Sequence, residues 1–573
     1  MTRSDDTDVR SDGGIAEGDE VFTEADAGKQ YRNTVYRDPD YESLETAPQT
    51  SEYPSTSGEG GFKLGDLPKV PKVSHIVGPS AVMLGASLGS GETMFWPTLI
   101  AQNGWGLYWA FWVGVITQFF INTELQRWTM ATGESIFSAF KRIHSVWPWF
   151  FLVAGFFHVG WPGWAAGSSK VAASFIGMDP NNWAVIGIGL MVLIWLSYQA
   201  GPILYNAIEK FQVALMIVAI AAAVVLVFIV GSIGQLANVP AGAVNFGALP
   251  QDMNIAVFLG GLAYAGAGGY VNLSQGVWAR EKGLGMATYQ GRVKNPLRGA
   301  DPEDVRQNGM TFEPTQKNLK RWRAWWKISQ QEHFLTFVVG LLVVATIAMT
   351  ITAQYAAGTD QGAINMWLNV VIPQLGSVNA TLVYAVTFIA LFSTQYAITE
   401  SFVRNSVDIL WQMVGAEAGW DLNKVFFGAL TLFVLWGIAI IGLQLQQPWI
   451  LLVIGAAIAG VMMWPYNALT IINNTTRLPE HTQPGWGRVV AMWWATGFFG
   501  YFSVLLIASQ LVNRFGLTTF QTSPAVVGSN VGAYVLWLLA LVVQVYTMYR
   551  SGTAKMTTSG TVDGADEAAG FLS

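Results

Sequence analysis

Apolar segments of about 20 residues recur along this chain of 573 residues, with short polar stretches between them. Each segment is long enough to cross the hydrocarbon core of a membrane as an α-helix. The pattern predicts about twelve membrane-spanning helices, over residues 77–101, 105–131, 148–176, 183–200, 204–232, 255–276, 334–356, 380–411, 424–443, 449–473, 489–512 and 530–549. The predicted fold class is therefore an all-α polytopic membrane protein.

The composition supports a membrane protein and excludes several kinds of chemistry. The chain is 52% hydrophobic and only 12% charged, about half the charge of an ordinary soluble domain. It contains no cysteine, which excludes disulfides, thiol nucleophiles and cysteine-ligated metals. A G-x-S-x-G pattern at residues 85–89 lies inside a predicted span rather than in a strand–turn–helix, so we expect a protein that is not an enzyme.

Positive charge alternates between successive loops. The loop over 278–333 carries eleven Lys and Arg residues, and the loops on the opposite side carry almost none. Loops rich in Lys and Arg face the cytoplasm, so we expect both termini to be cytoplasmic in a multi-pass protein of the cell membrane. Residues 1–62 hold fifteen Asp and Glu against five Lys and Arg; we expect a disordered acidic tail over 1–74 and a second cytoplasmic tail over 550–573.

The 278–333 loop is the one sizeable cytoplasmic insertion. Its last part, NLKRWRAWWKISQQEHF, mixes Trp with Lys and Arg, which is typical of an amphipathic helix on a membrane surface. A nucleic-acid patch would use the same residue types. The adjoining spans favour the lipid bilayer as the partner, and we expect no nucleic acid.

Two predicted spans contain clusters of glycine near their centres. The first span holds Gly89, Ser90, Gly91 and Glu92, and the sixth holds the segment 260–272 with Gly266, Gly269 and Asn272. These are the first spans of two five-span sets, over 75–232 and 255–475, and two more spans follow over 489–549. Since five is odd, the second set enters the membrane from the opposite side. Paired interruptions in two inverted halves indicate a transport site near the middle of the membrane.

Glu92 is the carboxylate beside the first interruption. An ionisable group at this depth costs at least about 2.5 kcal/mol, so it indicates a functional site by default. We expect Glu92 to bind a cation or to carry a proton. The structural alternative is that Glu92 caps the second half-helix.

Several stretches resemble the Nramp family of divalent-metal transporters. They are GPSAVMLGASLGSGETMFWPTLIAQNGWGLYW, NAIEKFQVALMIV, LFSTQYAITESFVRNSVDIL and LLVIGAAIAGVMMWPYNALTIINNTTRLPE. The resemblance implies a LeuT-like fold with a 5+5 inverted repeat plus two further helices. It also implies secondary active transport by alternating access, with a divalent cation as the transported substrate and no permanently bound cofactor.

The metal-binding motifs of that family are altered here. Where the family has Asp-Pro-Gly-Asn, this chain has residues 89–92, Gly-Ser-Gly-Glu; Gly266 and Gly269 stand at the ligand positions of the sixth span, and Asn272 matches. Without a thioether ligand, a metal at Glu92 would be a harder cation such as Mg²⁺ or Mn²⁺. Glycines also leave room for an organic solute such as an amino acid, and a non-transporting membrane sensor is a third reading.

The third span lacks the acidic residues that the family uses for protons. It offers Lys170 and His158 instead. We expect a proton pathway, and hence symport, through Glu92, Lys170 and His158, in which Lys170 pairs with, or relays protons to, Glu92 or another buried acid. The alternatives are a snorkelling Lys170 and a packing His158. Gln395 and Asn467 are further predicted pathway residues.

Overall fold

The computed structural model describes residues 41–558, except for 49, 51, 55–60, 72–75, 180–181, 202, 251–252, 299–302, 304, 445–447 and 515–530. The predicted acidic tail over 1–40 and the end of the chain after 558 lie outside the described residues.

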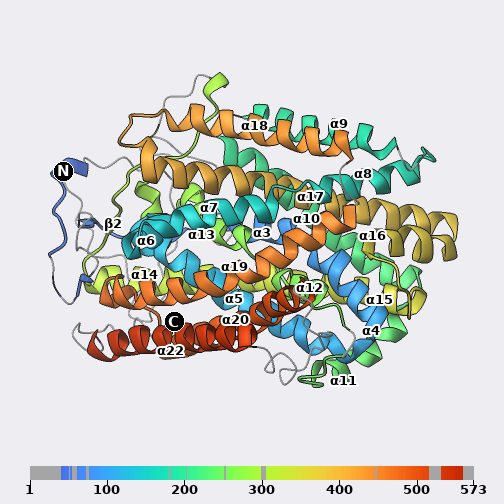
Figure 1. Cartoon of the computed structure of the whole chain (residues 1–573). Helices are drawn as coiled ribbons and strands as arrows, with labels where there is room; N and C mark the ends of the chain where they lie inside the picture. Colours follow the sequence, from blue (N-terminus) through green and yellow to red (C-terminus); the bar gives the residue numbers. More distant parts are fainter. Residues whose placement is uncertain are drawn as a thin grey trace.

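The described chain is a bundle of long helices (Figure 1). In chain order the helices are α3 Pro79–Leu88, α4 Trp96–Asn103, α5 Tyr108–Thr132, α6 Ile136–Ile143, α7 Val146–Val159, α8 Gly163–Phe175, α9 Trp183–Ser197, α10 Leu204–Ile229, α11 Val239–Ala243, α12 Ile255–Ala263, α13 Tyr270–Lys282, α14 Gln316–His333, α15 Gly340–Tyr355, α16 Ala363–Asn365, α17 Ser377–Leu410, α18 Leu422–Leu443, α19 Pro448–Thr476, α20 Trp486–Arg514 and α22 Val531–Thr558.

Eight helices among the described residues are long and apolar enough to cross a membrane. They correspond to eight of the twelve predicted spans. Of the other four, α5 is long but more polar, and three are divided into two shorter helices: α3 with α4, α7 with α8, and α12 with α13. The predicted all-α polytopic membrane fold is confirmed.

The centre of the bundle is built around the divided helices. α3 packs against α17 and α10, α12 packs against α19, and α13 packs against α5. The third divided span was not predicted. Its break, at 160–162, contains Pro162, which has no N–H to donate and directly precedes α8.

The predicted disorder over 1–74 is wrong for the described residues within 41–54, where Ala47 and Tyr53 are buried, and for residues 61–71. A parallel pair of two-residue strands joins β1 Lys63–Leu64 to β2 Met310–Thr311. Phe62 and Leu67 are fully buried, and Trp325 of α14 donates to the carbonyl of Pro68 at 2.8 Å. The few apolar residues of this segment are ordered because the 278–333 insertion supplies a surface that covers them.

The amphipathic helix before the seventh span is present, but it does not lie free on a membrane surface. α14 continues into α15 through a π-helical turn, Phe334–Val339, and the two run as one long helix. Trp322, Trp325 and Trp326 are buried against the protein rather than exposed to lipid. The Trp-rich face of α14, which the sequence pattern predicted to contact lipid, packs against the protein interior instead.

Candidate functional site

Both predicted helix interruptions are present. α3 ends at Leu88, Gly89 and Ser90 form a turn, and a π-helical turn over Gly91–Phe95 leads into α4. In the second half, α12 ends at Ala263 and α13 begins at Tyr270. The segment between them is non-helical, so its backbone groups are released from the helical hydrogen-bond ladder.

The two interruptions touch each other. A Cβ atom added to Gly91 would lie 1.3 Å from the carbonyl oxygen of Tyr264. No residue with a side chain fits there, so the absence of a Cβ at Gly91 is what lets the two broken segments meet. Gly91 and Tyr264, which are 173 positions apart in the chain, thus form one site.

Glu92 is fully buried at this meeting point. Neither of its carboxylate oxygens has a hydrogen-bond partner among the described residues. The backbone amides of Glu92 itself and of Gly266 lie near the carboxyl group, without a hydrogen bond of normal geometry. No side-chain hydrogen bond of normal geometry caps the π-helical turn Gly91–Phe95, so the capping alternative is not supported.

The helix α17 holds the first interruption in place. The amide of Gly89 donates to the hydroxyl of Thr394 at 2.9 Å, and Ser393 and Thr394 both donate to the carbonyl of Gly85. Ser90 donates to the carbonyl of Ser87 at 3.0 Å and so is used locally. Sequence reasoning missed Thr394, although adjacent hydroxyl residues in an apolar span are a readable signal of polar contacts between helices.

The glycines of the second interruption have positive φ angles and close neighbours. Gly266 has φ 134°, and a Cβ there would lie 2.5 Å from Oε1 of Gln118. Gly269 has φ 70°, and a Cβ there would lie 2.7 Å from Cε1 of His158. The sequence analysis expected these glycines to leave space for an organic solute. Neighbouring side chains fill that space.

His158 spans the second interruption. Its Nδ1 accepts the backbone N–H of Tyr270 at 3.1 Å, and its Nε2 lies 2.9 Å from the hydroxyl of Tyr264. Because Nδ1 accepts, the proton of the neutral ring is on Nε2 and is donated to Tyr264. These contacts hold the two ends of the break. A part for His158 in proton transfer remains a prediction.

Asn272 lies at the start of α13, and both polar atoms of its side chain form hydrogen bonds. Its amide donates to Asn122 and to Gln118, the latter at 3.3 Å, and its oxygen accepts from Tyr466 at 2.8 Å. Gln118 also donates to the carbonyl of Ala263 at 2.6 Å, at the end of α12. The sequence analysis missed Gln118 and Asn122, which lie four residues apart on one face of α5.

Gln395 and Asn467 have different surroundings. Gln395 accepts the N–H of Ala165 at 3.1 Å and so stabilises the start of α8, next to the unpredicted third break. Asn467 is fully buried, and neither of its side-chain polar atoms has a partner among the described residues. Its neighbour Tyr466 is the residue that donates to Asn272.

The predicted pairing of Lys170 with Glu92 or another buried acid is absent among the described residues, and a proton relay through Lys170 remains a prediction. Nζ of Lys170 donates to Oδ1 of Asn365 at 2.8 Å, and Glu92 has no partner within the described chain. The Lys170 side chain is only partly buried. This environment fits a lysine that reaches towards the membrane interface.

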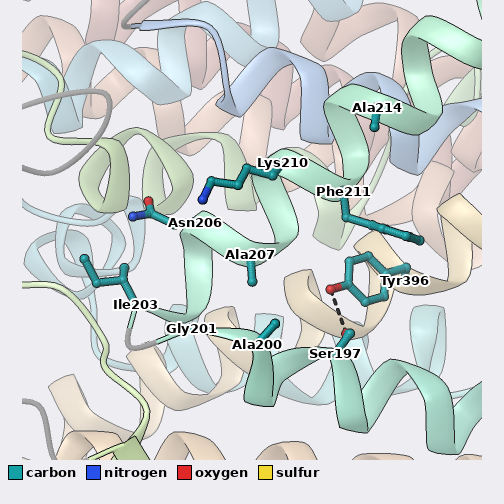
Figure 2. Close-up of a pocket in the computed structure, with 10 residues that line it drawn as sticks. All are labelled: Ser197, Ala200, Gly201, Ile203, Asn206, Ala207, Lys210, Phe211, Ala214 and Tyr396. Carbon is teal, nitrogen blue, oxygen red and sulfur yellow. Dashed lines mark hydrogen bonds between the residues drawn. The ribbon is translucent and has the colours of Figure 1, made fainter.

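A surface cavity of about 530 Å³ lies away from these residues (Figure 2). It is at the corner between α9 and α10, where Ser197 donates to the hydroxyl of Tyr396 at 2.8 Å. Asn206, Lys210 and Phe211 of α10 line it as well. None of the predicted site residues lines this cavity, so we do not assign it to the cargo.

The described residues contain no group of three or more His, Cys, Asp or Glu side chains placed to hold a metal. A cation at Glu92 would therefore have one carboxylate, with backbone and neutral oxygens completing its ligands.

Comparisons with known proteins identify the fold. Neither protein-family models nor curated proteins give a match. Among solved structures, a manganese transporter from Eremococcus coleocola, in complex with an aromatic bis-isothiourea compound, has a TM-score of 0.59 at 10% identity. The match covers 84% of this chain and 95% of the transporter, and a mutant of that transporter gives a TM-score of 0.58 over the same shares.

The nucleobase-cation-symport-1 transporter Mhp1 also matches, with a TM-score of 0.47 at 13% identity, over 91% of this chain and 99% of Mhp1. At 10% identity, the likeness to the manganese transporter establishes a shared fold. The chain has the fold of a LeuT-like transporter.

Proposed function

We propose that this protein is a secondary active transporter that moves a divalent metal cation across the membrane by alternating access. Glu92 binds the cation at the contact between the two broken helices. The observation that carries the proposal is a fully buried carboxylate with no partner in the described chain, at the one place where both interruptions meet.

The physical argument for a cation starts from Glu92. An ionised carboxylate in a buried site is stable only if it is paired or if it coordinates a cation. The C-terminal ends of α3 and α12 both face the interruptions, and the partial negative charge of a helix C-terminus favours a cation too. A proton on Glu92 satisfies the same requirement when no metal is bound.

The ligand chemistry favours a hard cation. Glu92 supplies a carboxylate at the first interruption, and no thioether stands at the sixth-span positions of Gly266 and Gly269. Such a site suits Mg²⁺ or Mn²⁺ that keeps several of its waters. The metal is cargo here, and we propose no resident cofactor.

The packing argues against a bulky organic solute. The glycines at 91, 266 and 269 have neighbours within 1.3–2.7 Å of where a Cβ would be, so they provide backbone contact rather than an open pocket. A small ion fits this arrangement better than an amino acid.

Uptake into proteoliposomes tests the proposal. Wild type should accumulate Mn²⁺ or Mg²⁺ and should not accumulate an amino-acid mixture. Glu92→Gln should lose most of the metal uptake, whereas Glu417→Gln, the same change at an exposed glutamate after α17, should not. Amino-acid uptake without metal uptake would overturn the metal as cargo, and normal metal uptake by Glu92→Gln would overturn the site.

A further inference from the structure

A second buried acid lies at the end of the molecule that the charge pattern places in the cytoplasm. Oε2 of Glu332, the second-last residue of α14, is 2.5 Å from the hydroxyl of Ser80 in α3. The same hydroxyl is 2.8 Å from Nδ1 of His333. Ser80 and His333 are fully buried and Glu332 is 5% exposed. One hydroxyl thus joins a carboxyl group to an imidazole across two helices.

The cation beside this cluster is already committed to another acid. Nζ of Lys282, at the end of α13, donates to Glu209 of α10 at 2.8 Å and to the carbonyl of Val77 at 2.8 Å. Glu332 has no ion pair within the described chain, and its carboxyl group lies near the backbone amide of Gly78 while Oε1 has no hydrogen bond of normal geometry there. The other charged or titratable groups that face the cluster are Tyr205, Arg292 and Arg488.

Two buried carboxyl groups therefore lie near one lysine, which pairs with Glu209 and not with Glu332. An ionised Glu332 would be a buried charge without a counter-charge, which is strongly unfavourable, so the packed state favours the protonated acid. A protonated Glu332 donates to the oxygen of Ser80, and Ser80 donates to Nδ1 of a neutral His333. The protons of Glu332 and Ser80 then each have an acceptor, whereas the Nε2–H of His333 has none among the described residues.

We propose that Glu332 is a proton-binding site whose proton is released when α3 moves away from α14. This inference rests on the proposed alternating-access function, because it assigns a coupling role to α3. That helix ends at Leu88, next to the interruption that carries Glu92. When α3 leaves, Glu332 loses Ser80 and meets water. The O–H bond of its carboxyl group breaks, and the proton passes to the solvent.

The direction of the pH effect follows from linkage. The packed state binds one proton more than the state with a hydrated Glu332, so acid favours the packed state and alkali favours the open one. The shift is limited to about tenfold in the equilibrium per pH unit, since a single proton is involved. It disappears once the pH is low enough to protonate the hydrated acid too.

The chain has no cysteine, so one introduced cysteine reports on α3 alone. Ala81, next to Ser80, is fully buried. In proteoliposomes of Ala81→Cys, labelling by a membrane-impermeant thiol reagent is divided at each pH by the labelling of the same cysteine in denatured protein, which removes the pH dependence of the thiolate itself. This ratio should be low at about pH 6 and should rise by up to about tenfold per unit towards about pH 9. The reagent should act from one side of the membrane only.

Glu332→Gln in that background should label slowly at every pH, because a glutamine mimics the protonated acid. Glu417→Gln should keep the wild-type pH profile. Ser80→Ala removes the acceptor of the Glu332 proton, so it should lower the pH at which labelling rises. Infrared spectra of the reporter protein should show a protonated carboxyl group that Glu332→Gln lacks.

An unchanged pH profile in both Glu332→Gln and Ser80→Ala would overturn the proposal, and so would a protonated carboxyl signal that survives Glu332→Gln unchanged. The assay contains no metal and no uptake step. If metal uptake is absent but the pH-dependent labelling is present, the cargo assignment fails and the proton site stands. If metal uptake is normal and labelling does not depend on pH, the proton site fails and the cargo assignment stands.

Discussion

Glu92 and Glu124 are both fully buried carboxylates within predicted spans, yet their surroundings are opposite. Glu124 accepts from Arg127 at 2.9 and 3.1 Å, from Arg488 at 2.9 Å and from Asn474 at 2.9 Å. Glu92 accepts no hydrogen bond from the described residues. Burial is the same at both sites, so the partners distinguish a carboxylate that stabilises the fold from one that is available to a ligand.

The contacts around Glu124 connect several helices. Arg127 of α5 lies over the ring of Trp326 in α14 at 3.7 Å, and Arg488 of α20 lies 4.7 Å from the same ring. Asn474 adds α19 to the group. Ion pairs and cation–π contacts join the helices around Glu124, whereas the carboxyl group of Glu92 has no such partner among the described residues. The proposed transport function needs both: a stable frame and a site that is incomplete until the transported ion binds.

The largest expected effect is on stability, at Glu124. Glu124→Gln should lower the free energy of unfolding by about 3–5 kcal/mol, because two buried arginines lose their counter-charge. Thermal unfolding followed by tryptophan fluorescence measures it. A loss below about 1 kcal/mol would show that this network does not stabilise the fold.

Glu92→Gln should reduce transport without reducing stability, the opposite of the effect expected for Glu124→Gln. Metal uptake should fall by about 100-fold, because the charged ligand is lost, and the free energy of unfolding should stay the same or rise. Uptake and thermal unfolding of one preparation check both halves. If Glu92→Gln destabilises the protein as much as Glu124→Gln does, Glu92 belongs to the frame and the contrast between the two residues fails.

A pH-dependent loss of stability should come from His481, in the loop between α19 and α20. Burial lowers the pKa of His481 to about 3, with the ring packed against Phe312 and Tyr53. The folded state requires the neutral ring, so its contribution is complete above about pH 6.5 and decreases as the pH falls. At about pH 5 the loss should reach about 2 kcal/mol relative to about pH 8.

The pH dependence of unfolding in wild type and in His481→Leu isolates this contribution. The leucine variant should lack that part of the acid-induced loss. Equal slopes in the two proteins would show that His481 is not buried in its neutral form.

The smallest expected effect is at Lys170. Lys170→Met removes one hydrogen bond to Asn365, worth about 1 kcal/mol, and should change metal uptake by less than about twofold. Uptake at several external pH values measures it. A loss of uptake comparable to that of Glu92→Gln would restore Lys170 to the transport pathway and place the two residues in one functional unit.

The sequence by itself determined the spans and the two interruptions around Gly91 and Gly266. Both features are local: an apolar stretch of 20 residues must span or be buried, and clustered glycine weakens a helix wherever it stands. It also identified Glu92, since a carboxylate in such a stretch has few structural uses.

Only the tertiary structure decided which polar groups have partners. The contact of Gly91 with Tyr264, the support from Gln118 and the pairing of Lys170 with Asn365 join residues that are far apart in the chain. The order of residues 61–71 likewise depends on contacts with α14. These features arise from helix packing, which sets the distances between side chains, and no local pattern of residues contains those distances.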